Sequence, residues 1–165
     1  MLPKLVITDI DGVWTDGGMF YGEAGGEWKK FNTSDSVGVL FLRNLGIPMA
    51  IMTGENSMAA KRRGEKLKVD HIYLAAKDKL SLATDLCTQL GIQLSEVGFI
   101  GDDINDLKLL QAVGVSASPA NAPRYIQERV HFVTQKRGGE GAFREFIETI
   151  LLHHDLLDRA LQPYL

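Results

Sequence analysis

The sequence is poor in cysteine and has no marked excess of either charge. Its single cysteine, Cys87, cannot form an internal disulfide, and this suits the reducing cytoplasm in which we expect the protein to function. The 18 Lys and Arg residues against 21 Asp and Glu residues leave a formal net charge of −3. A chain with this balance lacks the overall basic field that attracts a nucleic acid.

Long hydrophobic runs are absent as well. Nowhere do about 18 uncharged apolar residues follow one another, so the sequence predicts no membrane span. The first apolar run, Leu5–Ile7, is too short for a signal peptide and leads into acidic residues. We therefore expect neither a membrane nor a nucleic acid as a partner, although the composition leaves room for a local basic pocket that holds a small anion.

The residues that are present have the proportions of a globular protein, with 45% apolar and 24% charged side chains. The length of 165 residues fits one domain, and a chain of this size buries a substantial core without disulfides or metal ions as staples. No linker, repeat or low-complexity segment interrupts it. We expect a single domain over residues 1–165.

Short apolar runs alternate along the chain with segments of helical periodicity. The predicted strands are Lys4–Thr8, Ile47–Met52, Asp70–Leu74, Val97–Ile100, Val113–Ser116 and His131–Val133. The predicted helices are 34–45, capped by Ser34 or Asp35, then Asn56–Leu67, Lys77–Leu90, Ile104–Ala112, Ala122–Glu128 and Ala142–Leu152. This alternation predicts an α/β fold with a Rossmann-like, doubly wound and mostly parallel sheet.

A β-hairpin is predicted at about residues 19–31, with a turn at Ala24–Gly26. Its arms carry four aromatic residues, namely Phe20, Tyr21, Trp28 and Phe31. A two-stranded hairpin alone is marginally stable in water. The aromatic side chains therefore indicate burial against another subunit, with packing on the parent domain as the alternative.

Polar residues stand directly after three of the predicted strands. Asp9 and Asp11 follow the first strand, Thr53 follows the second, and Asp102 and Asp103 follow the fourth. Ligands of doubly wound folds bind outside the carboxyl ends of the strands, so we expect these side chains to share one site. Carboxylates without Cys or His suit a hard cation, and Mg²⁺ fits best because it uses few carboxylates and leaves positions for water and phosphate.

Two further residues extend this site toward phosphate chemistry. Lys79 opens a predicted helix and supplies a compact positive charge, while Thr53 supplies a hydroxyl and a backbone N–H. These groups, placed around an acidic nucleophile and Mg²⁺, predict phosphoryl transfer. Asp is among the residues that form covalent phosphoryl intermediates.

Four motifs, in this order, resemble those of the haloacid dehalogenase superfamily phosphatases. They are Asp9–Asp16, Thr53, Lys79 and Gly101–Asp106. Within that superfamily the chain is similar to the small sugar-acid phosphatases that act on 3-deoxy-manno-octulosonate 8-phosphate or on 2-keto-3-deoxynononate 9-phosphate. This closer likeness rests on Asp11–Gly17, Lys29–Asp35 and Gly138–Glu145, and it extends over all but the C-terminal tail.

The resemblance implies a role for each motif residue. Asp9 resembles the nucleophile, and Asp11 resembles the general acid that protonates the leaving oxygen and then activates water. The Asp9 carboxylate, the Asp11 backbone carbonyl and Asp102 would hold Mg²⁺, while Thr53 and Lys79 would hold the phosphoryl oxygens. Asp103 and Asp106 resemble residues that orient Lys79 and the water molecules of the metal. Near a helix start, however, Asp103, Asn105 and Asp106 are equally typical of caps.

The spacing between motifs leaves no room for a separate cap domain. Between Asp16 and Thr53 the chain accommodates the hairpin and one helix, and between Thr53 and Lys79 it accommodates one β–α unit. The active site should therefore be open unless another subunit covers it. The resemblance implies a homotetramer, because the similar phosphatases are tetramers whose hairpins pair.

An anionic sugar phosphate requires cations beyond Lys79, and the motifs together with the charged helix after Thr53 indicate which side chains contact it. The candidates are Thr53, Gly54, Glu55, Arg63, Lys66, Lys79 and Asn105. Arg62 and Arg144 stay open, because a solvated helix face is an equally good account of Arg62. Octulosonate phosphatases generally have Arg in place of Glu55, whereas nononate phosphatases resemble this chain there and at Lys66. We therefore expect the nononate ester, of nonulosonate (sialic acid-like) biosynthesis, with the octulosonate ester as the alternative.

Two other protein classes compete with a phosphatase. A receiver-type signalling domain also combines carboxylates, Mg²⁺, Thr and Lys, but its acceptor Asp follows the third strand, and here Asp70–Leu74 is followed by Ala75. A dinucleotide-binding enzyme would need Gly-x-Gly-x-x-Gly after the first strand, which this chain lacks.

Overall fold

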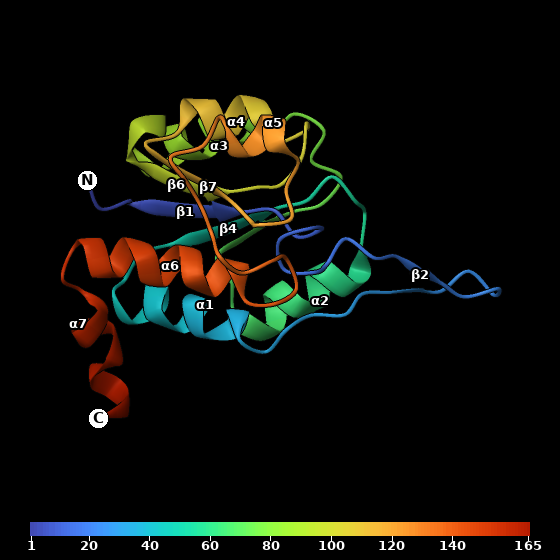
Figure 1. The fold of residues 1–165 in the computed structure, drawn as a ribbon, viewed down its shortest axis with the longest axis horizontal. Coiled ribbons are helices and arrows are strands. Elements are labelled where there is room, and N and C mark those ends of the chain that lie inside the picture. The colour runs from blue at the N-terminus through green and yellow to red at the C-terminus, as the bar shows by residue number, and fades with distance from the viewer.

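A six-stranded parallel sheet forms the centre of the structure, a computed structural model that describes residues 1–165 (Figure 1). The strand order is β5-β4-β1-β6-β7-β8, and every neighbouring pair is parallel. The strands are β1 (Leu5–Thr8), β4 (Met49–Met52), β5 (His71–Tyr73), β6 (Val97–Ile100), β7 (Val115–Ser118) and β8 (Phe132–Val133). The doubly wound fold predicted from the sequence is confirmed, and no cap domain is present.

Helices cover both faces of this sheet (Figure 1). They are α1 (Asp35–Asn44), α2 (Met58–Leu67), α3 (Lys79–Leu90), α4 (Leu107–Ala112), α5 (Arg124–Gln127), α6 (Ala142–His153) and α7 (Leu157–Leu161). Short 3₁₀ turns add Leu94–Glu96 and Gln162–Tyr164. No helix combines the length and the hydrophobicity that crossing a membrane would require.

Two hydrophobic clusters lie on opposite faces of the sheet, and β1 contributes to both. Val6 belongs to the cluster beneath α1 and α6, whereas Leu5 and Ile7 belong to the cluster beneath α3 and α4. Side chains alternate between the faces of a strand, so a strand buried on both faces must be apolar throughout. This is why the residues of β1 before Thr8, Leu5 to Ile7, are all apolar.

The fifth predicted strand is displaced by two residues, because β7 begins at Val115 rather than at Val113. The Val113 N–H still bonds to the Leu109 carbonyl and ends α4. Gly114 then lies against the chain, and a Cβ at this position would collide with the backbone carbonyl of Ser95. The close contact between Gly114 and Ser95 therefore comes before β7 begins. Val113 is apolar because it is buried in the core, not because it pairs with a neighbouring strand.

The predicted hairpin is present but its paired arms are shorter than expected. They are β2 (Phe20–Tyr21) and β3 (Glu27–Trp28), which pair antiparallel and project from the domain (Figure 1). Phe20, Tyr21 and Trp28 are 55%, 72% and 68% exposed. Phe31 instead packs against the α1–α6 core, so three of the four aromatic residues fit the prediction of an outward-facing surface.

The C-terminal segment forms an element for which the sequence carried no clear signal. Helix α7 packs against the core through Leu157 and Leu161, and Asn44 donates a hydrogen bond to the Ala160 carbonyl at 2.9 Å. These contacts tie α7 to α1. A five-residue helix is too short to show periodicity, so only its tertiary contacts explain it.

The predicted N-cap position of α1 is confirmed at Ser34, but no side chain caps the helix there. Ser34 occupies the cap position with helical backbone angles and makes no capping bond with its side chain. Asp35 is instead fully buried, and its carboxylate accepts a hydrogen bond at 3.0 Å from the backbone N–H of Arg144 in α6. Burial raises the pKa of Asp35 to about 6, even though this hydrogen bond and the Arg63 guanidinium favour the charged form.

We expect Asp35 to make the protein less stable as the pH rises from about 4 to about 6. The folded chain holds a proton on Asp35 in this range and the unfolded chain does not, so the free energy of unfolding falls by roughly 3 kcal/mol. Asp35→Asn keeps an oxygen acceptor for Arg144 but removes the titration. Urea unfolding of both proteins at pH 4, 5, 6 and 7 should give curves that converge toward low pH, with the variant more stable at pH 7. Curves that stay parallel over this range would contradict the assignment.

Candidate active site

Polar loops after β1, β4 and β6 meet at the carboxyl edge of the sheet. They enclose a cavity of about 230 Å³ that has no hydrophobic lining residue. Its lining residues are Asp9, Asp11, Gly12, Gly17, Thr53, Gly54, Glu55, Asp102, Asp103 and Asn105. β1 lies between β4 and β6 in the sheet, so motifs far apart in the sequence converge here.

Lys79 lies beneath this cavity, at the first turn of α3. Its ammonium group is fully buried, 2.9 Å from Asp9 Oδ1 and 2.5 Å from Asp106 Oδ1. Burial alone would lower the pKa of Lys79, but the two carboxylates outweigh it and raise that pKa above its usual value. Asp78 caps the helix by accepting the Ser81 N–H, which fixes the turn from which Lys79 projects. The structure thus holds a permanent cation against Asp9.

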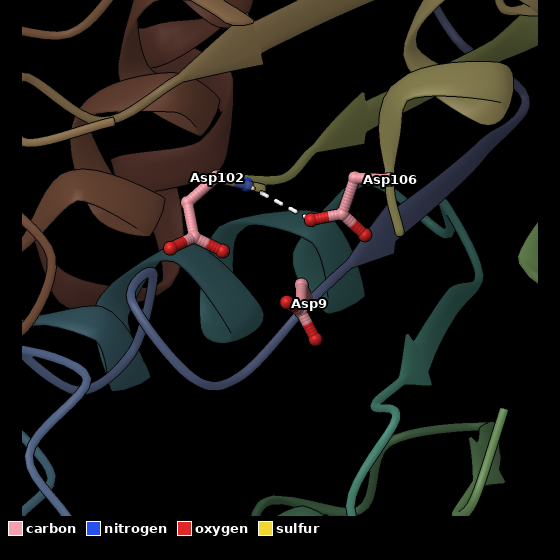
Figure 2. Close-up of side chains that lie close together, drawn as sticks. All are labelled: Asp9, Asp102 and Asp106. Atoms are coloured by element: carbon pink, nitrogen blue, oxygen red, sulfur yellow. Dashed lines mark hydrogen bonds between the residues drawn. The ribbon is translucent and has the colours of Figure 1, made fainter. Parts of the chain in front are cut away.

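Asp106 links the remaining groups of the site (Figure 2). One of its oxygens binds Lys79, and the other accepts the backbone N–H groups of Asp102 at 2.9 Å and Asp103 at 3.3 Å. These bonds position the loop after β6. Both oxygens of Asp106 are thus occupied by protein donors, so Asp106 acts on other site residues rather than on a ligand.

Three carboxylates crowd around one lysine at this edge. Oxygen atoms of Asp9, Asp102 and Asp106 all lie within 4.8 Å of one another. Burial, with the negative charge of Asp106, raises the pKa of Asp9 well above its usual range. Burial also raises the pKa of Asp102 to about 7, with Asp106 and Asp103 adding to the effect. The cluster therefore needs more positive charge than Lys79 supplies.

The donor set fits Mg²⁺, because all its charged ligand atoms are carboxylate oxygens. Gly12 keeps this region open, since a Cβ at its positive φ of 81° would collide with the carboxylate of Asp102. A hard divalent cation between Asp9 and Asp102 would restore both to their charged forms. The carboxylate of Asp11 lies outside this cluster, and its Oδ1 accepts a hydrogen bond from Lys29 instead.

Thr53 and Glu55 form the wall of the cavity that follows β4. Thr53 is fully buried, and its hydroxyl accepts the Glu55 N–H at 3.3 Å. Its backbone is held to β5 by a bond from the Thr53 N–H to Tyr73, and its carbonyl accepts the Ala76 N–H. Glu55 is exposed at the mouth of the cavity. The wall thus pairs a fixed hydroxyl with an anionic side chain that faces solvent.

Two of the predicted substrate contacts do not line this cavity. Arg63 and Lys66 lie on α2 and share a separate hollow of about 470 Å³ with Phe31 and Arg62. Arg63 donates a hydrogen bond to Ser36 at 2.7 Å, which draws its guanidinium toward α1. Arg144, which the sequence left open, pairs with Glu148 at 2.7 Å. Within one chain, the cationic side chains of α2 are therefore separate from the carboxylate site.

One residue of the site was missed by the sequence analysis. Lys29, from the hairpin, lies 2.6 Å from Asp11 Oδ1. The alternation of polar and aromatic residues in the hairpin gave no indication that one lysine turns inward. Its place within the family-like segment Lys29–Asp35 was the only available signal.

Comparison with known proteins places this site in a family. Residues 64–146 match the model of the haloacid dehalogenase-like hydrolases. The chain is 37% identical to the 3-deoxy-D-manno-octulosonate 8-phosphate phosphatase KdsC of Yersinia pestis over 157 residues. This alignment covers 95% of this chain and 84% of the relative.

Solved structures agree with that match over nearly the whole chain. A probable YrbI family phosphatase from Pseudomonas syringae pv. phaseolica superposes with a TM-score of 0.94 at 37% identity, covering 98% of this chain and 92% of that one. The octulosonate 8-phosphate phosphatase of Moraxella catarrhalis, solved with a magnesium ion, a phosphate ion and KDO, has a TM-score of 0.94 at 36% identity. It covers 99% of this chain and 94% of its own.

Proposed function

The chain belongs to the haloacid dehalogenase-like hydrolases and is a Mg²⁺-dependent sugar-acid phosphatase, and we propose that its substrate is 3-deoxy-D-manno-octulosonate 8-phosphate. The observation that carries the phosphatase activity is the buried Asp9 carboxylate held against Lys79 at the floor of a wholly polar cavity. The relatives named for this substrate match at 35–37% identity over most of the chain and support the octulosonate ester.

In the proposed mechanism Asp9 is the nucleophile. One of its carboxylate oxygens attacks phosphorus, and the bond between phosphorus and the sugar oxygen breaks. The electron pair of that bond stays on the leaving sugar oxygen, which takes a proton from Asp11. Lys79 and Thr53 stabilise the phosphoryl oxygens by charge and by hydrogen bonding. The products of this step are the free sugar acid and an aspartyl phosphate on Asp9.

Water completes the reaction. Asp11, now deprotonated, removes a proton from a water molecule as the water oxygen attacks phosphorus. The bond between phosphorus and Asp9 breaks, and its electron pair restores the carboxylate. Mg²⁺, held by the Asp9 and Asp102 carboxylates and the Asp11 backbone carbonyl, would neutralise phosphoryl charge in both steps. Phosphate leaves through the open mouth of the cavity.

The nononate 9-phosphate is the second candidate, favoured by Glu55. A carboxylate at the mouth of the cavity accepts hydrogen bonds from a sugar hydroxyl, which Arg cannot do. Steady-state kinetics on both esters decides between them. We expect the higher kcat/KM on the octulosonate ester, and the opposite order would favour the nononate ester. Failure to hydrolyse either ester would contradict the proposed substrate class.

Replacing Glu55 by Arg should move the ratio of kcat/KM values toward the octulosonate ester by roughly tenfold. The change removes an acceptor for a sugar hydroxyl and adds a donor for an anionic group, so the two esters respond in opposite directions. Asp85→Arg, on the exposed face of α3, makes the same change of charge away from the site and serves as the control. A ratio that moves equally in both variants would show that Glu55 does not contact the sugar.

We also expect the hairpin to mediate assembly into a homotetramer. Its three exposed aromatic residues form an apolar surface that a lone hairpin does not bury. Light scattering at micromolar concentration should give the mass of four chains, and Trp28→Ser combined with Tyr21→Ser should lower it. Wild-type protein that stays a monomer under these conditions would contradict the expectation.

A further inference from the structure

Lys29 is an unusual residue for a projecting hairpin, because its side chain is completely buried while its neighbours Trp28 and Lys30 are exposed. The ammonium group lies 2.6 Å from Asp11 Oδ1 and 3.2 Å from Glu27 Oε1. Met19 Sδ also lies 3.2 Å from the ammonium group. The base of the hairpin thus folds a cation back onto the domain.

The surroundings of Lys29 keep it charged. Burial by itself would lower its pKa, but the hydrogen bonds and negative charges of Asp11 and Glu27 outweigh burial and raise that pKa. A charged lysine without access to water must keep its partners, because an unpaired buried charge is costly. The contact between Lys29 and Asp11 is therefore a persistent one.

The two carboxylate oxygens of Asp11 differ in their hydrogen bonding. Oδ1 accepts the hydrogen bond from Lys29, whereas Oδ2 is buried and has no hydrogen-bond partner. Asp11 also lines the polar cavity beside Asp9. A carboxyl group held at one oxygen can rotate little, so the contact with Lys29 fixes the carboxyl group of Asp11 at the wall of the cavity.

We propose that Lys29 is a positioning residue that holds the carboxyl group of Asp11 through Oδ1 beside Asp9 and so sets the place from which Asp11 exchanges a proton with the leaving oxygen. The inference rests on the proposed role of Asp11 as the general acid and extends that role to the hairpin. Glu27 also contacts Lys29, and the position of the hairpin thereby sets the position of the acid. The competing account is structural, with Lys29 merely tying the hairpin to the domain.

The effect of a Lys29 substitution on esters with different leaving groups distinguishes the positioning role from the structural one. A sugar alkoxide needs a proton to depart, whereas the acidic p-nitrophenol departs without one. The parameter kcat/KM reports the steps up to formation of the aspartyl phosphate, so later hydrolysis does not mask the effect. Lys29→Met should lower kcat/KM for the sugar-acid ester by about 100-fold, in the range of general acid catalysis. The loss for p-nitrophenyl phosphate should be at least about tenfold smaller.

Lys30→Met provides the matched control, since Lys30 is adjacent but exposed and has no ion pair in the structure. Lys29→Arg should recover part of the activity on the sugar-acid ester, because it returns a donor to Asp11 Oδ1. Glu27→Gln offers a milder second variant if Lys29→Met does not fold, and it should shift the two esters in the same unequal way.

Equal losses of kcat/KM on both esters would overturn the inference and show that Lys29 only attaches the hairpin to the domain. The proposed function is tested separately by the wild-type enzyme, because failure of that enzyme to hydrolyse the sugar-acid ester does not depend on Lys29. Wild-type turnover of that ester with unequal losses in Lys29→Met supports both proposals. Wild-type turnover with equal losses supports the function alone.

Discussion

Asp9→Asn should lower kcat by about 10⁴-fold or more, because an amide oxygen is far too weak a nucleophile to attack phosphorus. The cavity around Asp9 contains no second carboxylate that is paired with Lys79, so no neighbouring group replaces it. Phosphate release measures the loss. Acid quenching during turnover adds a direct readout, since wild-type protein should carry a phosphoryl group on Asp9 and the variant should carry none.

Stability measurements distinguish this result from unfolding. Asp9 is a buried carboxylate whose pKa is raised by burial and by Asp106, so its replacement by a neutral amide relieves repulsion. In metal-free buffer the variant should unfold at the same temperature as the wild type or a higher one. Asp85→Asn, on the exposed face of α3, controls for the loss of one negative charge. More than about a tenth of wild-type activity in Asp9→Asn would contradict a covalent route through this residue.

The part of the site that was predictable from the sequence is the part built at strand ends. Asp9, Thr53 and Asp102 each directly follow a buried strand or lie one residue beyond it, and parallel strands bring such positions to one edge. Local pattern is enough for that prediction, because the apolar runs identify the strands and the crossover rule brings their ends together.

Contacts that depend on how a loop folds back were not predictable. Lys29 and Asp11 are 18 residues apart, and no periodicity relates a hairpin arm to the loop after β1. Arg63 shows the reverse case. Its charge and its place on the helix after Thr53 made it a candidate substrate contact, and within one chain the hydrogen bond to Ser36 holds it toward α1 and outside the carboxylate cavity. In both cases the packing of one element against another decides the direction of a long side chain, and sequence spacing carries no record of that direction.

The absence of a cap domain makes the hairpin more important to the site than its size suggests. The cavity opens to solvent beside Glu55, and the hairpin is the only element that both projects from the domain and contacts the carboxylate site (Figure 1). Its outer face carries exposed aromatic residues, and its base holds Asp11 through Lys29. Assembly through the outer face would therefore restrict the movement of the hairpin segment that carries Lys29. Because Lys29 holds Asp11, the expected tetramer would in this way influence proton transfer.

Lys79→Met should lower the free energy of unfolding by about 3–5 kcal/mol in metal-free buffer, the range for breaking a buried ion pair on one side. The methionine fills a similar volume, but Asp9 and Asp106 lose the cation that lies 2.9 and 2.5 Å away. Urea unfolding with a chelator present measures the loss. Added Mg²⁺ should restore part of it, because a cation would again offset the carboxylates. Activity should fall as well, since the phosphoryl group loses its lysine.

A second substitution tests whether the loss arises from charge or from packing. Asp106→Asn combined with Lys79→Met removes one of the uncompensated carboxylates, while the amide oxygen can still accept the Asp102 N–H. If charge is the cause, the double variant should be more stable than Lys79→Met alone by about 1–3 kcal/mol, a coupling expected for residues in direct contact. Catalysis should not return, because neither change restores a cation to the phosphoryl oxygens. Losses that simply add in the double variant would show that Lys79 stabilises the fold through its alkyl chain rather than through its charge.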